Sequence, residues 1–181
     1  MMIRVMKRAK TLVIYVFLFH IVRILADLFL PNAHIFNLIR GAVIGPFLAD
    51  RGRGLAIASG VIINGAWNLR VGQNVYIAHN CWLNATGGLV IEAGAILSPN
   101  VVVATTAHRR EHSAVSLRQS NQSPVFIGSG AWVASNSVVT RGAHIGEGAV
   151  IAAGSVVGGT VPPRSLYRGN PASLVKVFDD V

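Results

Sequence analysis

The chain has 181 residues, which is enough for one domain, or for one domain and an appended segment. It is 52% hydrophobic and 13% charged, which excludes an intrinsically disordered chain, and its single cysteine, Cys81, excludes an internal disulfide framework and fits a reducing compartment. The net charge of +9 is compatible with an anionic ligand, an anionic membrane surface or simple solubility, but no DNA- or RNA-binding motif accompanies it. We therefore expect no nucleic-acid partner.

The first 31 residues predict a helix that is basic at its start and apolar afterwards. Four basic residues precede the apolar stretch: Arg4, Lys7, Arg8 and Lys10. That stretch ends at Pro31 and is interrupted by Arg23 and Asp27, which share one helix face with His20. Two charges near the centre of a helix are costly inside a bilayer.

Three roles remain open for this helix, in order of preference. It packs on the rest of the protein or on a neighbouring subunit; it lies in a membrane interface through residues 1–30, with its basic residues on acidic headgroups; or it spans a membrane. Residues 32–54 predict a second short helix and a glycine-rich segment that leads into a repetitive region.

Aliphatic residues recur at a step of six or eight positions from Ile57 onward, with one step of 24. These anchors are Ile57, Ile63, Val71, Ile77, Leu83, Ile91, Leu97, Val103, Ile127, Val133, Val139, Ile145, Ile151 and Val157. Asn or Gly stands three positions after most of them, at Gly60, Asn74, Asn80, Gly94, Asn100, Gly130, Asn136, Gly142, Gly148 and Gly154. Because both residues tolerate left-handed backbone angles, these positions predict tight corners.

A unit of six residues is too short for a hairpin or a helix, but it fits one short strand and one corner. Stacked units of this kind bury a continuous core. Small residues four positions after many anchors, Cys81 and Ala107 among them, have the same strand parity as the anchors and are expected in the same interior. The repeats therefore predict a parallel β-solenoid.

The irregular steps predict the number of sides. Steps of eight end at Val71 and Ile91, which are twenty residues apart, as three sixes and a two-residue bulge require. If a coil has three sides, the two-residue bulges lie at the same corner in successive coils. The insertion between Val103 and Ile127 then starts from that corner one coil later. His108, which opens this insertion, then lies on that edge of the prism. The same edge carries four residues of the coil below: Asn84, Thr86, Gly87 and Gly88.

The chain resembles the hexapeptide-repeat acyltransferases, in the branch of galactoside, maltose and polysaccharide O-acetyltransferases. The resemblance is carried by the segments VYIAHNCWLNATGGLVIEAGAILSPNVVVATTAH, VFIGSGAWVASNSVVTRGAHIGEGAVIAAGSVV and VPPRSLYRGNPASLVK, within residues 57–176. It implies an all-β fold, a three-sided left-handed parallel β-helix with an N-terminal helical segment. We divide the chain into this helical segment (1–54), the β-helix (55–162, with a loop at 108–124) and a C-terminal tail (163–181).

The resemblance also implies the roles of residues near the insertion. In the family, a histidine at the mouth of the loop is the general base, and His108 occupies that position. Asn84 matches an asparagine that touches the acceptor or the acetyl group, and the coil register independently places it beside His108. Glu111 and His112 are candidates for binding the acceptor, or are solvated loop residues.

Coenzyme A carries phosphates, so it is a candidate ligand for the basic excess. By resemblance, its pantetheine arm runs along three small residues: Gly146, Ala152 and Gly158. Trp132 contacts it or packs structurally, while Arg168 and Lys176 resemble basic residues around its nucleotide or are ordinary surface charges. No Cys, His or Asp cluster has the spacing of metal ligands, so we expect no metal site.

The sequence thus predicts an enzyme that transfers an acetyl group from acetyl-CoA, its co-substrate, to a hydroxyl of a saccharide. We expect a polysaccharide or a lipid-linked glycan precursor. A free sugar, or an amino sugar acetylated on nitrogen, is the alternative acceptor, and a non-catalytic scaffold is an alternative of another class. The family implies a homotrimer, and the N-terminal helix favours a cytoplasmic protein at the inner face of the membrane.

Overall fold

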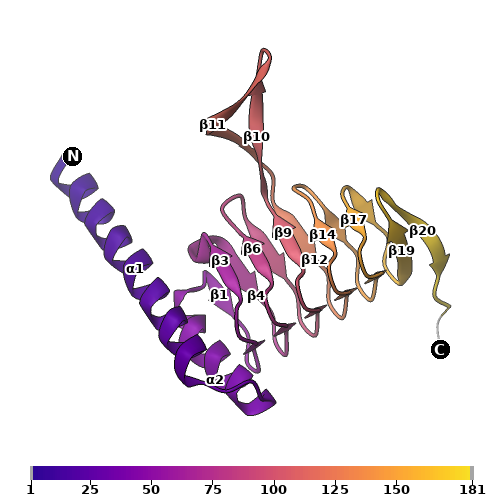
Figure 1. Ribbon diagram of the computed structural model, residues 1–181, viewed down its shortest axis with the longest axis horizontal. Helices are drawn as coiled ribbons and strands as arrows, with labels where there is room; N and C mark the ends of the chain where they lie inside the picture. Colours follow the sequence, from indigo (N-terminus) through magenta and orange to yellow (C-terminus); the bar gives the residue numbers. More distant parts are fainter. Residues whose placement is uncertain (1, 180–181) are drawn as a thin grey trace.

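Three parallel β-sheets form the sides of a prism in the computed structural model, which describes the backbone of residues 2–179 and the side chains of residues 13 and 15–179 (Figure 1). Side A contains β1 (Asp50–Arg51), β4 (Leu69–Val71), β7 (Leu89–Ile91), β12 (Val125–Ile127), β15 (His144–Ile145) and β18 (Thr160–Val161). Side B contains β2 (Ala56–Ile57), β5 (Tyr76–Ile77), β8 (Ile96–Leu97), β13 (Trp132–Val133), β16 (Val150–Ile151), β19 (Ser165–Gly169) and β20 (Ala172–Val177). Side C contains β3 (Ile62–Asn64), β6 (Trp82–Asn84), β9 (Val102–Ala104), β14 (Val138–Val139) and β17 (Val156–Val157).

The chain visits sides A, B and C in turn, so the predicted three-sided parallel β-helix is confirmed. All the predicted anchors are buried; the most exposed of them, Val71, is 4% exposed. Anchors one coil apart are direct strand partners, such as Ile57 with Ile77 and Leu83 with Val103. Every Asn and Gly predicted at a corner has a positive φ angle. Burial of one aliphatic side chain contributes roughly 1.5–3 kcal/mol, so the stacked anchors are the main source of stability.

The corner between sides C and A, here named the C–A corner, is irregular in successive coils, as the steps of eight and 24 predict. Its first level holds the short 3₁₀ helix η2 (Ala66–Asn68), and the Asn68 side-chain amide donates to the Thr86 carbonyl in the next coil at 3.0 Å. One coil further, the Gly87 N–H donates to the Thr105 hydroxyl at 2.8 Å. The three irregular segments therefore stack on one edge.

The long insertion is a β-hairpin that projects from the C–A corner (Figure 1). Strand β10 (Thr106–Glu111) pairs antiparallel with β11 (Ala114–Gln122). Ala107 is exposed, which corrects the expectation that it shares the core: β10 leaves the prism before this residue, so strand parity no longer directs its side chain inward.

The β-helix extends beyond the expected range 55–162 at both ends. Strand β1 already pairs in parallel with β4, ahead of residue 55. At the other end β19 pairs in parallel with β16 and continues side B, and β20 then folds back on β19 in antiparallel fashion. Most of the segment 163–181 is therefore part of the sheet rather than a separate tail.

Two helices lie at the N-terminal end of the β-helix (Figure 1). They are α1 (Met2–Phe29) and α2 (His34–Ile44), and the short 3₁₀ helix η1 (Gly45–Phe47) follows. Helix α2 packs on side B with Gly41 against the Leu55 carbonyl, where any larger side chain would collide. Helix α1 packs through Phe19, which is buried, and through Tyr15, whose ring lies 5.3 Å from that of Phe47.

Asp27 joins the two helices to the first coil. Its carboxylate lies 3.5 Å from the guanidinium groups of both Arg23 and the buried Arg40, and it accepts a hydrogen bond from the Gly60 N–H at 3.3 Å. The charges that interrupt the apolar stretch thus form a structural ion-pair cluster. Within the described part of the chain, no helix combines the length and the apolar character that crossing a membrane requires.

Candidate active site

His108 lies at an irregularity of the hairpin. It is opposite Ser120, while Arg110 is already opposite Val115, so two residue steps on β10 match five on β11. The excess residues bulge out around Leu117, and the Gln119 N–H closes this bulge by donating to the Ser116 hydroxyl at 3.1 Å. Bulges of this kind re-aim side chains beside active sites.

The bulge brings the Ser116 carbonyl to the imidazole of His108. The His108 Nδ1 atom lies 3.0 Å from this oxygen. A carbonyl oxygen only accepts hydrogen bonds, so Nδ1 must carry the proton. In the neutral ring the proton is then absent from Nε2, which holds a free lone pair. The backbone of β11 therefore selects the tautomer in which His108 can act as a base through Nε2.

Asn84 lies on the coil next to the hairpin, and its side chain is fixed at both ends. Its Nδ2 donates to the Thr106 hydroxyl at 2.9 Å, and its Oδ1 accepts from the Thr86 N–H at 3.1 Å. Beneath it, the buried Thr105 hydroxyl donates to the Asn84 carbonyl at 2.7 Å. The expected neighbourhood of Asn84, Thr86 and the start of the insertion is thus present.

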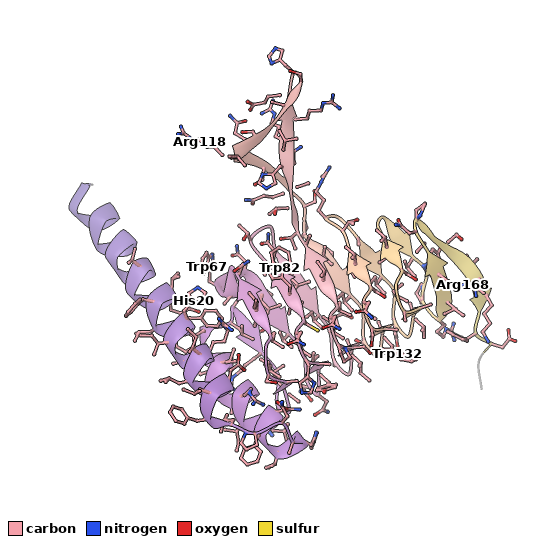
Figure 2. The ribbon with its side chains drawn as sticks, viewed as in Figure 1. His20, Trp67, Trp82, Arg118, Trp132 and Arg168 are labelled. Carbon is pink, nitrogen blue, oxygen red and sulfur yellow. The ribbon has the colours of Figure 1, made fainter. Side chains whose placement is uncertain are left out.

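A groove of about 470 Å³ lies between side C and the overhanging bulge. It is lined by Trp82, Asn84, Thr86, Thr106, His108, Leu117, Arg118, Gln119 and Ser120. Figure 2 shows Trp82 at the foot of the hairpin and Arg118 on the overhanging strand above it. None of these described lining residues is acidic. The groove therefore offers an imidazole base, an aromatic surface and several hydroxyl and amide groups to a polar ligand.

Glu111 and His112, the other candidates for acceptor binding, are at the tip of the hairpin. Both are exposed, and neither lines the groove with His108. His112 has a φ angle of 53° because it forms the hairpin turn. In one chain these two residues lie three and four residues beyond His108, roughly 10–13 Å along the hairpin towards its tip.

The candidate coenzyme A residues with large side chains share side B. Trp132 is 46% exposed and donates from Nε1 to the Ser98 hydroxyl at 2.8 Å. Arg168 is on β19, and Lys176 is on β20 with its ammonium group 5.0 Å from the centre of the Phe178 ring. Side B is opposite the C–A corner, and Figure 2 shows Trp132 and Arg168 away from the hairpin.

The three small candidates, Gly146, Ala152 and Gly158, are not brought together. Gly146 follows a strand of side A, Ala152 one of side B and Gly158 one of side C. A step of six residues moves the chain to the next side of the prism, so residues six apart occupy three different corners. Of the three, Gly158 shares the C–A corner with His108. A single groove on one chain cannot include all of them.

Other polar sites are remote from this groove. A larger cavity of about 780 Å³ lies between α2 and the first coils of side B, where His34, Tyr76 and His79 line it. His144 points outward from β15, with its ring centre 5.6 Å from that of Phe126. Among the described residues, no group of three His, Cys, Asp or Glu side chains is arranged to hold a metal ion.

Two residues important to the geometry were not singled out from the sequence. Thr105 connects adjacent coils at the C–A corner through its hydroxyl. The sequence signal that could have identified Thr105 is its position, directly before Thr106 and three residues before His108. Ser116 orients His108 through its backbone carbonyl, a role that any residue type can fill. No sequence pattern could therefore have identified Ser116.

Comparisons with known proteins show what the chain is similar to in sequence and fold. A family model described as "Bacterial transferase hexapeptide (six repeats)" matches residues 124–159. A provisionally named acetyltransferase of Staphylococcus aureus is 36% identical over 114 residues, which are 63% of this chain and 57% of the relative. The galactoside O-acetyltransferase of Escherichia coli is 26% identical over 141 residues, or 78% of this chain and 70% of the relative.

The fold is shared with solved structures. The structure of a galactoside acetyltransferase in complex with coenzyme A superposes with a TM-score of 0.79 at 24% identity, covering 90% of this chain and 80% of the other. The chain spans less than two thirds of the length of the Staphylococcus aureus relatives that it matches. The chain is thus similar in sequence to the hexapeptide transferases over part of its length and to a galactoside O-acetyltransferase, and it shares its fold with solved galactoside and maltose acetyltransferases.

Proposed function

We propose that the protein transfers an acetyl group from acetyl-CoA to a hydroxyl group of a saccharide, with His108 as general base. The observation that carries this proposal is the hydrogen bond from His108 Nδ1 to the Ser116 carbonyl, because it leaves Nε2 as a proton acceptor beside the groove. The relative named galactoside O-acetyltransferase supports the type of reaction.

In the proposed step, Nε2 of His108 removes the proton of the acceptor hydroxyl while its oxygen attacks the thioester carbonyl carbon. The tetrahedral intermediate then collapses, the carbon–sulfur bond breaks, and the departing sulfur of coenzyme A takes the proton from His108. General base catalysis of this kind contributes roughly 10²–10⁴-fold to a rate. Asn84, held by Thr106 and Thr86, is placed to hold the acceptor or the acetyl group.

We further propose that the working form is a homotrimer. In one chain, His108 on the C–A corner and the candidate coenzyme A residues on side B face different directions. Both sets can meet only where the hairpin of one chain reaches side B of a neighbour. Glu111 and His112, which do not line the groove of His108 in their own chain, would then contact the neighbouring chain or its ligand.

We propose a polysaccharide or a lipid-linked glycan precursor as the acceptor, in the cytoplasm at the inner face of the membrane, with contact through residues 1–30. A free sugar, or an amino sugar that is acetylated on nitrogen, is the alternative. The polar groove with Trp82 at its foot suits a sugar, and the long helix α1 is compatible with work at a membrane surface.

Thiol release from acetyl-CoA in the presence of a panel of glycans, sugars and amino sugars tests the reaction. Thiol release with the wild-type protein, its loss in His108→Ala and its retention in His34→Ala, an exposed histidine at the start of α2, are expected. Wild-type release no greater than that of His108→Ala with every acceptor would refute the reaction. Light scattering tests the trimer, which should have three times the 19.2 kDa of the chain.

A further inference from the structure

Helices α1 and α2 expose a large apolar surface that the proposed reaction does not use. The exposed residues, here named the outer helix face, are Val13, Phe17, Leu18, Ile21, Ile24, Leu25, Leu28 and Phe29 of α1 and Ile35, Ile39 and Val43 of α2. Leu28 and Phe29 are both 71% exposed. Single exposed apolar residues are normal, but a large contiguous set marks an interaction surface.

The outer helix face is not the side by which the helices attach to the protein. Helix α1 attaches through Phe19 and Ala26, and α2 attaches through Arg40 and Ile44, all of which are buried. At 100° per residue, Phe17, Ile21, Ile24 and Leu28 of α1 and Ile35 of α2 lie roughly opposite these buried residues. The flanks are also apolar, with Leu18, Leu25 and Phe29 on α1 and Ile39 and Val43 on α2. Each helix is therefore apolar on two sides. One side packs on the β-helix, and the other is exposed.

The position of this surface is fixed before any partner binds. The Tyr15 hydroxyl donates to the Phe47 carbonyl, and the Phe47 ring also packs 5.6 Å from that of Phe19. Asp27 pairs with Arg40, and Arg40 also donates to the Leu30 carbonyl. Since these contacts hold the helices, binding through the outer helix face requires no folding of a disordered segment, which lowers its entropic cost.

Charge identifies the occupant of this surface. Residues 1–26 contain five basic residues and no acidic residue; the basic ones are Arg4, Lys7, Arg8, Lys10 and Arg23. The first acidic residue, Asp27, is already paired with Arg23 and Arg40. A second copy of this chain would bring the same positive charge, whereas an anionic bilayer combines an apolar interior with the opposite charge.

We propose that the outer helix face binds an anionic bilayer in the plane of its surface. This inference deepens the membrane location proposed above and rests on it, and it adds α2 to the contact. Helix α1 is 28 residues long, about 42 Å at 1.5 Å per residue, and an in-plane helix of this kind buries its apolar side about 5–10 Å deep. Basic residues at its start then meet the anionic headgroups.

Flotation of the full-length protein with vesicles tests the proposal. We expect binding to vesicles of phosphatidylglycerol and phosphatidylcholine, weakened by salt, and little binding to phosphatidylcholine alone. The triple variant Phe17→Ser, Ile24→Ser and Leu28→Ser should bind more than about tenfold more weakly, because three exposed side chains no longer enter the bilayer. Lys7→Glu with Arg8→Glu should lose the preference for anionic vesicles.

A matched control replaces exposed apolar residues at the other end of the molecule. The variant Leu174→Ser with Val177→Ser alters side chains that are 51% and 58% exposed on β20, and it should bind vesicles like the wild type. Circular dichroism checks that each variant is folded. Because the replaced side chains are exposed, the triple variant should melt at the temperature of the wild type.

Three results would overturn the inference. They are an absence of wild-type binding to anionic vesicles, undiminished binding by the triple variant, and a change of oligomeric mass in that variant with its vesicle binding intact. The last would show that the outer helix face joins copies of the chain. Lost vesicle binding with intact thiol release refutes this inference alone, whereas lost thiol release with intact vesicle binding refutes the proposed reaction alone.

Discussion

The coils of the β-helix and the hairpin that leaves them are built in opposite ways. In the coils, the strands direct aliphatic anchors into a closed interior, and neighbouring anchors one coil apart are strand partners. In the hairpin nearly every residue is exposed, and its geometry depends on a few local hydrogen bonds. If the coils supply the stability and the hairpin the proposed chemistry, substitutions in the two regions should have separable effects.

The largest expected effect is on activity, in the hairpin. His108→Ala should lower the rate of acetyl transfer by roughly 10²–10⁴-fold, because the base that removes the acceptor proton is lost. Its urea midpoint should remain that of the wild type, since the imidazole is exposed and packs on no anchor. A lower urea midpoint for His108→Ala would contradict the idea that hairpin substitutions affect activity without affecting stability.

The largest expected effect on stability is in the coils. Leu97→Ala should lower the free energy of unfolding by about 2–5 kcal/mol, because Leu97 is fully buried and its removal leaves a cavity. The matched variant Leu117→Ala removes a leucine that is 90% exposed on the hairpin, and it should leave the free energy of unfolding unchanged. Urea denaturation of both variants measures the contrast.

Thr105→Val changes the point at which coil and hairpin meet. Its hydroxyl accepts from the Gly87 N–H and donates to the Asn84 carbonyl, and valine leaves both groups without this partner. We expect a loss of roughly 1–3 kcal/mol of stability. Activity should also fall, because the Asn84 backbone loses one of the hydrogen bonds that position it. A variant with lower stability and full activity would show that the coil edge does not position Asn84.

A corner substitution should have a smaller effect. Gly154 has a φ angle of 70°, and an added Cβ would meet nothing within 4 Å, so Gly154→Ala tests backbone strain alone. We expect a loss of about 1–2 kcal/mol, and a smaller loss for Gly154→Asn, because asparagine tolerates left-handed angles. Thermal unfolding compares the two variants, and equal losses would contradict the strain argument.

The last prediction needs no substitution and concerns the buried thiol of the coils. Burial raises the pKa of Cys81 to about 11 from 9.0, so the thiol should not react with Ellman's reagent at pH 8 until the protein unfolds. The folded state keeps the thiol proton up to a higher pH than the unfolded state does. The free energy of unfolding should therefore fall as the pH rises from about 9 towards about 11. Rapid labelling of the native protein would contradict this.

The coils could be predicted from the sequence because each anchor and each corner residue follows a local rule. Ile57 and Asn74, for example, need only strand parity and a left-handed corner. The two steps of eight even placed Asn84 beside the insertion. The same rule separates residues 146, 152 and 158, because a step of six positions along the chain leads to the next side of the prism and not to the next level of the same side.

The hairpin and the helices could be predicted less well, since their geometry depends on contacts between distant or chemically unspecific groups. The bulge opposite His108 depends on the Ser116 carbonyl, which the residue type does not encode. The buried face of α1 depends on Asp27, whose partners Arg40 and Gly60 are 13 and 33 residues away along the chain. Helical periodicity alone does not predict which of the two apolar sides of α1 packs on the β-helix and which is exposed.

The three-sided coil also sets a distance along the molecule. On side B, β8 is followed by β13, β16 and β19, so Arg168 is three strand spacings, about 14 Å, above the level from which the hairpin leaves. Inserting eighteen residues as one extra coil between them would lengthen this separation by about 4.8 Å and keep Arg168 on side B. Inserting six residues would instead move it to a different side. In the proposed trimer, the number of coils would therefore determine how long a ligand must be to contact both His108 of one chain and Arg168 of its neighbour.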